Sequence, residues 1–216
     1  MTTMVLVGGC FSGGTTLTVD LIARAFDQDL GATLAYSEYP STALLCRRWI
    51  AEPTPILRGL ATQLFQEVKE AIESALADRV WLLKHPNLLS LAPLVAQVLA
   101  PHGHRVVTVG TRRSVDDIVH SLIRRGWYGP DERPLRTAAR LLVARALEAD
   151  VVFDYDRCLT DPIPTTEALL HAVARVTSWS LVRGAEDVAG MIRRPRVLDH
   201  GTSRSASSRL ARPRTR

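Results

Sequence analysis

The segment that most constrains the fold of this chain is GGCFSGGTTL, at residues 8–17. It follows the short apolar run MVLV and precedes TVDLIARAF, where a helix is expected. A strand, a glycine-rich turn and a helix in this order are typical of the first unit of a parallel α/β sheet. The sequence therefore predicts a strand at 4–8 that leads directly into a helix at 15–27.

The rest of the chain repeats this alternation of short β-branched runs and longer amphipathic stretches. Further strands are expected at 32–36, 80–84, 105–110 and 150–155. Further helices are expected at 41–51, 56–77, 88–100, 114–125, 134–149 and 165–178. The pattern predicts an α/β fold with one doubly wound, mainly parallel sheet of about five strands flanked by helices.

Charge and composition indicate one globular domain followed by a basic tail. With 46% hydrophobic and 23% charged residues, the 216-residue chain can bury a substantial core. The net charge of +5 comes from five arginines in residues 201–216, a stretch with no acid. We therefore expect a neutral domain at 1–195 and a solvated, disordered tail at 196–216, and the charge does not predict a nucleic-acid partner.

Cysteine usage and hydropathy bear on the compartment. The three cysteines are widely separated and lack metal-site spacing, which favours reduced thiols over a disulfide framework. No apolar stretch approaches the roughly 20 residues that span a bilayer, and the N-terminus lacks a signal-peptide pattern. The expectation is a cytoplasmic protein without a membrane span.

The glycine loop is a candidate phosphate site. Residues 8–15 fit the frame G-x-x-x-x-G-K-[ST] of P-loop NTPase-like folds, except that Gly14 stands where lysine is usual. Loop N–H groups and the positive helix N-terminus attract anions. Without the lysine, an ordinary nucleoside triphosphate is a less favourable ligand. A plain turn that uses glycine for positive φ angles is the structural alternative.

A second candidate anion site follows the fourth predicted strand, in VGTRRSVDDIVHSLIRRGW. Arg113 ends the strand, and Ser121 lies eight residues later, about two helical turns along the next helix. A guanidinium and a hydroxyl on the same side of a helix can both bind one phosphate. Arg124 and Arg125, one turn further, are placed to reach a nucleotide or an acidic acceptor. A solvated helix face is the alternative for all four residues.

Taken together, these motifs resemble the sulfotransferases that use 3′-phosphoadenosine 5′-phosphosulfate (PAPS). SGGTTL resembles the 5′-phosphosulfate loop of that family, and RSVDDIVHS resembles its arginine and serine eight residues apart. VWLLKHPNLLSLAPLV and VVFDYDRCLTDPIPTTEALLHAV resemble two later segments, so the likeness runs in order over residues 4–178. One departure is that Ser12 and Gly13 stand where the family has a basic residue and a serine.

The resemblance implies PAPS as co-substrate, no metal, and transfer to a hydroxyl or amine of a small-molecule or carbohydrate acceptor. The 3′-phosphate would lie on Arg113 and Ser121. The 5′-phosphosulfate would lie on the loop residues Ser12, Gly13, Gly14, Thr15 and Thr16.

Transfer also needs a base and a cation near the reacting group. Glu38, just after the second predicted strand, and His85, after the third, are the two candidate bases, with Glu38 slightly favoured. Lys84 is the candidate electrostatic stabiliser, and it also offers the charge that the loop lacks. The structural alternatives are a helix-terminal acid for Glu38, a turn residue before a proline for His85 and a surface ion pair for Lys84.

Two other functions remain open from the sequence. A P-loop small-molecule kinase would need Mg²⁺ on a carboxylate, for which Asp154 and Asp156 are candidates. A non-catalytic nucleotide-binding module would keep the fold without turnover. The pair His102 and His104 has no acidic or cysteine partner nearby in the sequence, so it is not expected to bind metal.

Overall fold

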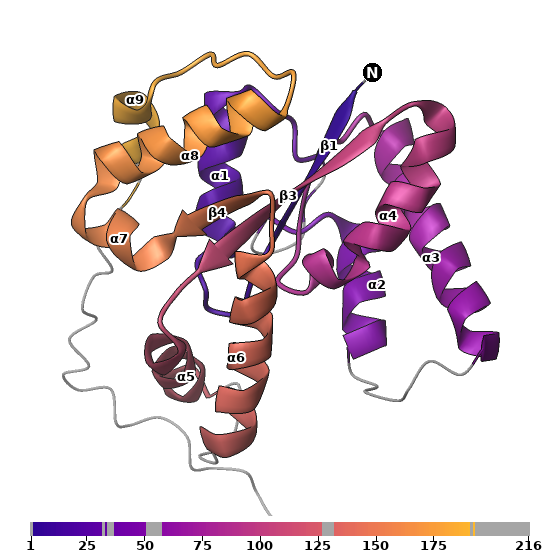
Figure 1. Cartoon of the computed structure of the whole chain (residues 1–216), viewed down its shortest axis with the longest axis horizontal. Coiled ribbons are helices and arrows are strands. Elements are labelled where there is room, and N and C mark those ends of the chain that lie inside the picture. Colours follow the sequence, from indigo (N-terminus) through magenta and orange to yellow (C-terminus); the bar gives the residue numbers. More distant parts are fainter. Residues whose placement is uncertain are drawn as a thin grey trace, which may run out of the picture.

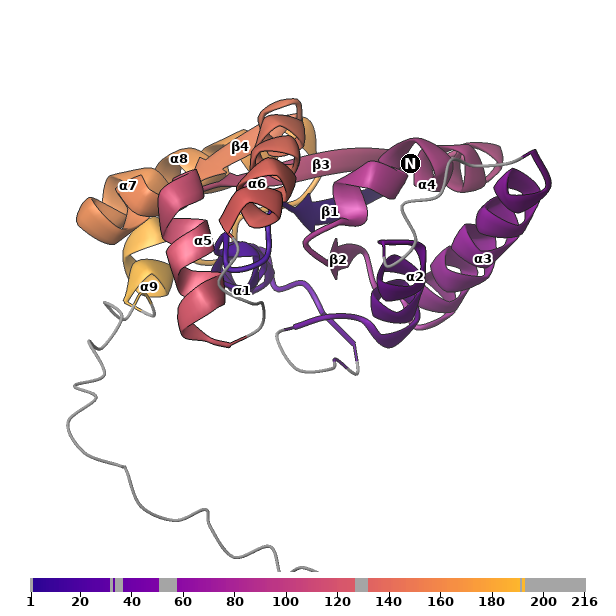
Figure 2. The ribbon, with the colours of Figure 1, turned by 90° about the horizontal axis from the view of Figure 1, so that it is seen from below.

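The sheet has four parallel strands. The computed structural model describes residues 2–31, 33, 37–50, 58–126, 132–190 and 192, without the side chains of 47–50 and 58–61. Within these residues the strand order is β2-β1-β3-β4 (Figures 1 and 2). The strands are β1 (Thr3–Gly8), β2 (Leu82–Lys84), β3 (Arg105–Arg112) and β4 (Val151–Asp154).

The predicted α/β class and the parallel sheet are confirmed. All three pairs of neighbouring strands are parallel. The strands predicted at 4–8, 80–84, 105–110 and 150–155 correspond to β1 to β4. The fifth predicted strand, at 32–36, lies outside the described residues except for residue 33, which is in neither a helix nor a strand.

Strand β1 lies inside the sheet, between β2 and β3, and carries apolar side chains on both of its faces. All six of its residues are buried. Val5 and Val7 join a core cluster on one face, and Met4 and Leu6 join the cluster on the other. A strand that is covered on both faces and bonded on both edges reads as a continuous apolar run, as MVLV does.

Helices connect the strands and cover the sheet. The predicted helices are present, with shifts of a few residues at their ends. The helices α7 and α9 were not predicted from the sequence. A 3₁₀ turn, η1 (Leu88–Leu91), precedes α4, and another, η2 (Ala100–His102), follows it. The helices are α1 (Thr15–Ala25), α2 (Pro40–Ile50), α3 (Arg58–Ala77), α4 (Ala92–Leu99), α5 (Val115–Arg124), α6 (Glu132–Leu147), α7 (Tyr155–Thr160), α8 (Pro162–Val176) and α9 (Ala185–Ala189).

The two faces of the sheet carry different helices. α1, α8 and α9 pack with the cluster that contains Val5 and Val7. α2, α3 and α4 pack with the cluster that contains Met4 and Leu6. In both views α5 and α6 lie to one side of β1, and α2 and α3 lie to the other (Figures 1 and 2).

The order of the strands marks where a ligand should bind. The chain passes from β1 to β2 on one side, and then crosses back to β3 on the other side of β1. In open parallel sheets, ligands bind outside the carboxyl ends of the strands at such a reversal. The segments that leave β1 and β3 are the glycine loop and the stretch that begins with Arg113.

No helix in the described part of the chain is long and apolar enough to cross a membrane. The predicted basic tail, at 196–216, lies outside the described residues.

Candidate functional site

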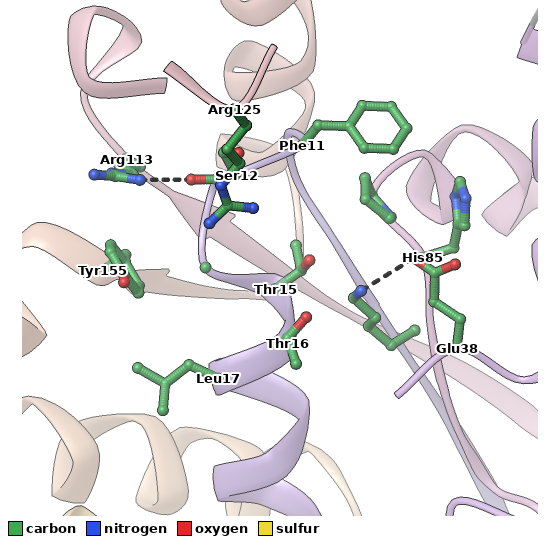
Figure 3. Close-up of a pocket in the computed structure, with 13 residues that line it drawn as sticks. Phe11, Ser12, Thr15, Thr16, Leu17, Glu38, His85, Arg113, Arg125 and Tyr155 are labelled. Carbon is green, nitrogen blue, oxygen red and sulfur yellow. Dashed lines mark hydrogen bonds and ion pairs between the residues drawn. The ribbon is translucent and has the colours of Figure 1, made fainter. Parts of the chain in front are cut away.

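A cavity of about 470 Å³ opens at the carboxyl edge of the sheet. Segments that follow all four strands contribute to its wall, together with residue 38 and the end of α5 (Figure 3). Eight of the ten predicted site residues line it, and a ninth, Gly13, lies in the loop that borders it. The lining residues are Phe11, Ser12, Gly14, Thr15, Thr16, Leu17, Glu38, Lys84, His85, Pro86, Arg113, Arg125 and Tyr155.

Backbone hydrogen bonds hold the glycine loop in place. Gly9 N–H donates to the carbonyl of Pro86 at 2.8 Å, which ties the loop to the turn after β2. Gly13 N–H donates to the carbonyl of Cys10 at 2.9 Å. Ser12 lies between them with φ of 57°, and its Oγ is buried without a hydrogen-bond partner among the described residues. The loop therefore holds a polar atom that a ligand can satisfy.

The position that usually carries lysine is closed by an aromatic ring. Gly14 has φ of 93°, and a Cβ at this position would overlap the ring of Tyr155 at the start of α7. Both the left-handed backbone and the ring exclude a longer residue. The tertiary structure thus requires glycine at position 14 and leaves no room there for a lysine.

The N-terminus of α1 faces the same cavity. Gly14 is its N-cap residue, no side-chain hydrogen bond caps the helix, and no acid lies in its first turn. Thr15 and Thr16, the first two helical residues, line the cavity. The partial positive charge of the helix terminus is therefore directed into this cavity.

Arg113 is fixed against the loop by three groups. Its Nη1 donates to the carbonyl of Ser12 at 2.7 Å, and its Nε lies 3.5 Å from Oδ1 of Asp156. Its guanidinium carbon lies 5.0 Å from the centre of the Tyr155 ring. The arginine predicted from the RSVDDIVHS motif therefore does border the loop (Figure 3).

Ser121 occupies a different position from Arg113. Helix α5 begins at Val115 with Ser114 as its N-cap, and Ser121 is buried in the middle of the helix. Ser121 is not among the residues that line the cavity. Arg125, the residue at the C-terminal end of α5, does line it. The role of Ser121 on a 3′-phosphate stays a prediction.

Lys84 and Glu38 form a buried ion pair at the other end of the cavity. Nζ of Lys84 lies 3.2 Å from Oε1 of Glu38, and the two side chains are 2% and 6% exposed. Burial lowers the pKa of Lys84, while the charges of Glu38 and Asp20 act in the opposite direction. The pair thus places a cation and a carboxylate next to each other at the cavity wall. Lys84 and Glu38 were both predicted to lie near the reacting group, and the structure brings them to one cavity.

A second carboxylate supports this pair from α1. Asp20 accepts a hydrogen bond from Ser37 Oγ at 2.9 Å, so it joins the helix to the residue before Glu38. Burial raises the pKa of Asp20, although the Ser37 hydrogen bond and the charges of Arg24 and Lys84 oppose the shift. Asp20 was not predicted from the sequence, which has no local signal for it.

His85 presents one particular tautomer to the cavity. Its Nδ1 accepts the N–H of Asn87 at 3.2 Å, and Phe11 packs edge-on against its ring at 6.0 Å between centres. A neutral imidazole that accepts at Nδ1 carries its proton on Nε2. With Nδ1 occupied by the Asn87 N–H and a proton on Nε2, the His85 ring has no nitrogen left to accept a proton. His85 is therefore less suited than Glu38 to act as a base in this arrangement.

The two aspartates considered for Mg²⁺ have structural partners. Asp154 caps α7 through the N–H of Arg157 and pairs with Arg112 at 2.8 Å. Asp156 accepts the N–H of Ser114 at 2.7 Å and pairs with Arg113. In the described ranges no group of three or more histidine, cysteine or acidic side chains is arranged to hold a metal ion.

The cysteine in the loop is not a candidate nucleophile. Cys10 is buried, and burial raises the pKa of its thiol to about 12. A thiol that stays protonated at neutral pH is a poor nucleophile.

Tyr155, like Asp20, is a residue of the site that the sequence did not predict. It lies in VVFDYDRCLTDP, a segment that resembles one of the later sulfotransferase segments, but nothing in the sequence shows that its ring reaches Gly14.

Comparisons with known proteins do not assign a family. The sequence matches no protein-family model and no curated protein.

Proposed function

We propose that this chain is a sulfotransferase that moves the sulfonate of PAPS to a hydroxyl or amine of a small-molecule or carbohydrate acceptor. The observation that carries the proposal is one cavity bordered by a lysine-free glycine loop, the N-terminus of α1 and three cations. These cations are Lys84, Arg113 and Arg125. Further support comes from the sequence, because the glycine loop and the segment that begins with Arg113 both resemble phosphate-binding segments of the PAPS-dependent sulfotransferases.

In the proposed reaction the acceptor oxygen or nitrogen forms a bond to sulfur while the bond from sulfur to the 5′-phosphate oxygen breaks. The electron pair of the broken bond stays on adenosine 3′,5′-bisphosphate. Glu38 takes the acceptor proton, and Lys84 stabilises the charge on the sulfonate and leaving oxygens. The 3.2 Å pairing keeps the two groups together for these tasks.

The adenosine nucleotide would lie along the loop. Ser12, Gly13, Gly14, Thr15 and Thr16 would hold the 5′-phosphosulfate through N–H and hydroxyl groups. Arg113 would hold the 3′-phosphate with Ser121. Metal is not needed for this reaction, because the transferred group is polarised by lysine and backbone dipoles.

The kinase is the second candidate, and the site favours it less. Tyr155 closes the position of the P-loop lysine, and both aspartates proposed for Mg²⁺ have structural tasks. A non-catalytic nucleotide-binding module would need no base. The buried Glu38 and Lys84 pair at the cavity wall favours an enzyme over that module, because a buried ion pair adds little to stability on its own.

Calorimetric titration with adenosine 3′,5′-bisphosphate, and separately with ATP and Mg²⁺, tests the proposal. We expect the bisphosphate to bind and Arg113→Ala to weaken it about 10- to 100-fold, as for a lost charged hydrogen bond. Arg112→Ala is the matched control, since Arg112 is half exposed, pairs with Asp154 and is absent from the cavity lining.

Three results would contradict the proposal in different ways. Preference for ATP with Mg²⁺ would make the kinase the better hypothesis. Binding of the bisphosphate without turnover of PAPS by any hydroxyl or amine acceptor tried would favour the non-catalytic module. Equal binding by the Arg113→Ala variant and the parent protein would remove Arg113 from the nucleotide site.

A further inference from the structure

The glycine loop, at residues 8–17, carries no cationic side chain of its own. Ser12 stands where a basic residue is expected, and Tyr155 prevents one at position 14. Three cations line the cavity, namely Lys84, Arg113 and Arg125. In the proposed function Lys84 acts on the transferred sulfonate and Arg113 on the 3′-phosphate, so no cationic side chain is yet assigned to the 5′-group at the loop.

Helix α5 is packed directly onto the glycine loop. Its buried residues Ile118, Val119 and Leu122 form one core cluster with Cys10 of the loop, and Phe11 packs against this cluster. The position of α5 relative to the loop is therefore set by burial of apolar side chains. The backbone at the end of α5 is therefore held at a constant place with respect to Ser12.

The backbone at the end of α5 fixes the starting point of the Arg125 side chain. Arg125 N–H donates to the carbonyl of Ser121 at 3.2 Å, and Gly126, with φ of 67°, ends the helix in the left-handed region. From this point the Arg125 side chain extends toward the loop at Ser12 (Figure 3). Arg124 and Arg125 are both exposed, but Arg125 lines the cavity and Arg124 does not.

We propose that Arg125 binds the anionic 5′-group held by the loop, and so supplies from α5 the positive charge that the loop itself lacks. This inference rests on the proposed function and adds a binding residue to it. The buried, unpartnered Oγ of Ser12 and the N-terminus of α1 would contact the same anion. A guanidinium suits this task because its fork of donors matches two oxygens of a phosphate or sulfonate.

Titration with the two adenosine monophosphates separates the two ends of the nucleotide. We expect Arg125→Ala to weaken adenosine 5′-monophosphate about tenfold or more and to leave adenosine 3′-monophosphate within about twofold. Arg113→Ala should show the reverse preference. Arg124→Ala removes the same charge from the neighbouring exposed position and should change neither affinity. Thermal unfolding of each variant checks that the fold is retained.

The outcomes of this experiment distinguish the inference from the proposed function. An Arg125→Ala variant that binds the 5′-monophosphate as well as the parent does, or that loses both monophosphates equally, would overturn the inference and leave the sulfotransferase proposal standing. A similar loss in Arg124→Ala would also overturn it, because general electrostatics would then explain the effect. Failure of the parent protein to bind either monophosphate or the bisphosphate would remove both.

Discussion

Two ion pairs each supply a cation to the wall of the same cavity, and they differ mainly in their exposure to water. Lys84 and Glu38 are 2% and 6% exposed, whereas Arg113 and Asp156 are 19% and 39% exposed. In the buried pair each charge depends on its partner, because neither can be solvated if the other is removed. In the partly exposed pair, water and neighbouring dipoles replace a lost partner at low cost.

This difference separates stability from function at the two ends of the site. At the Lys84 end, a substitution that affects transfer also affects folding. At the Arg113 end, a substitution can change ligand binding with little effect on folding. The residues suited to mapping ligand contacts are therefore those of the loop and α5, rather than those of the buried pair.

The largest effect is expected from breaking the buried pair. Lys84→Met leaves the Glu38 carboxylate buried without its cation, and should lower the free energy of unfolding by about 3–5 kcal/mol. The double variant Lys84→Met/Glu38→Leu removes both charges and should recover most of this loss. Denaturant unfolding of the parent, the single variants Lys84→Met and Glu38→Leu, and the double variant measures the coupling.

Sulfonate transfer should not follow stability in this series. The double variant lacks both the proposed base and the proposed stabiliser, so it should fold without transferring sulfonate from PAPS. A double variant that is as unstable as Lys84→Met would show that the pair is held by packing instead of charge. Retained transfer in the double variant would reassign the catalytic roles.

A smaller effect is expected at the partly exposed pair. Asp156→Asn keeps an oxygen for the N–H of Ser114 but removes the charge beside Arg113. A double-mutant cycle with Arg113→Met, followed by denaturant unfolding, should give a coupling of about 0.2–1 kcal/mol. A coupling as large as that of Lys84 and Glu38 would invalidate the comparison between the two ends.

The smallest effect is a pH-dependent one at Asp20, beside the buried pair. The raised pKa of Asp20 means that the folded state disfavours its charged form, so the parent protein loses stability as pH rises from 3.8 through the folded-state pKa. Asp20→Asn does not titrate and still accepts the Ser37 hydrogen bond. It should be more stable than the parent at pH 7.

This advantage of Asp20→Asn should decrease as pH falls and should vanish below pH 3.8, where Asp20 is protonated in both states. Thermal unfolding from pH 3 to 8 gives the difference directly. A variant that is less stable than the parent at pH 7, with no dependence on pH, would mean that the charged form is the one that the fold favours. The Lys84 charge would then outweigh burial.

Much of the architecture was predictable because it is encoded locally. Apolar runs and their spacing placed all four described strands and the longer helices. The short α7 and α9 were missed, since five or six residues carry too little periodicity to identify a helix. Arg113 at the loop followed from a motif, but the burial of Ser121 in α5, away from the cavity lining, did not.

The sequence by itself determined a parallel α/β sheet and a glycine loop without lysine, since both depend on neighbours along the chain. Only the tertiary structure decided that Lys84 meets Glu38 across 46 residues, that Arg113 meets Ser12 across 101, and that Tyr155 closes position 14. These contacts depend on strand order and on how apolar clusters pack the helices. Strand order and packing are set by burial between segments distant in sequence, which local spacing does not encode.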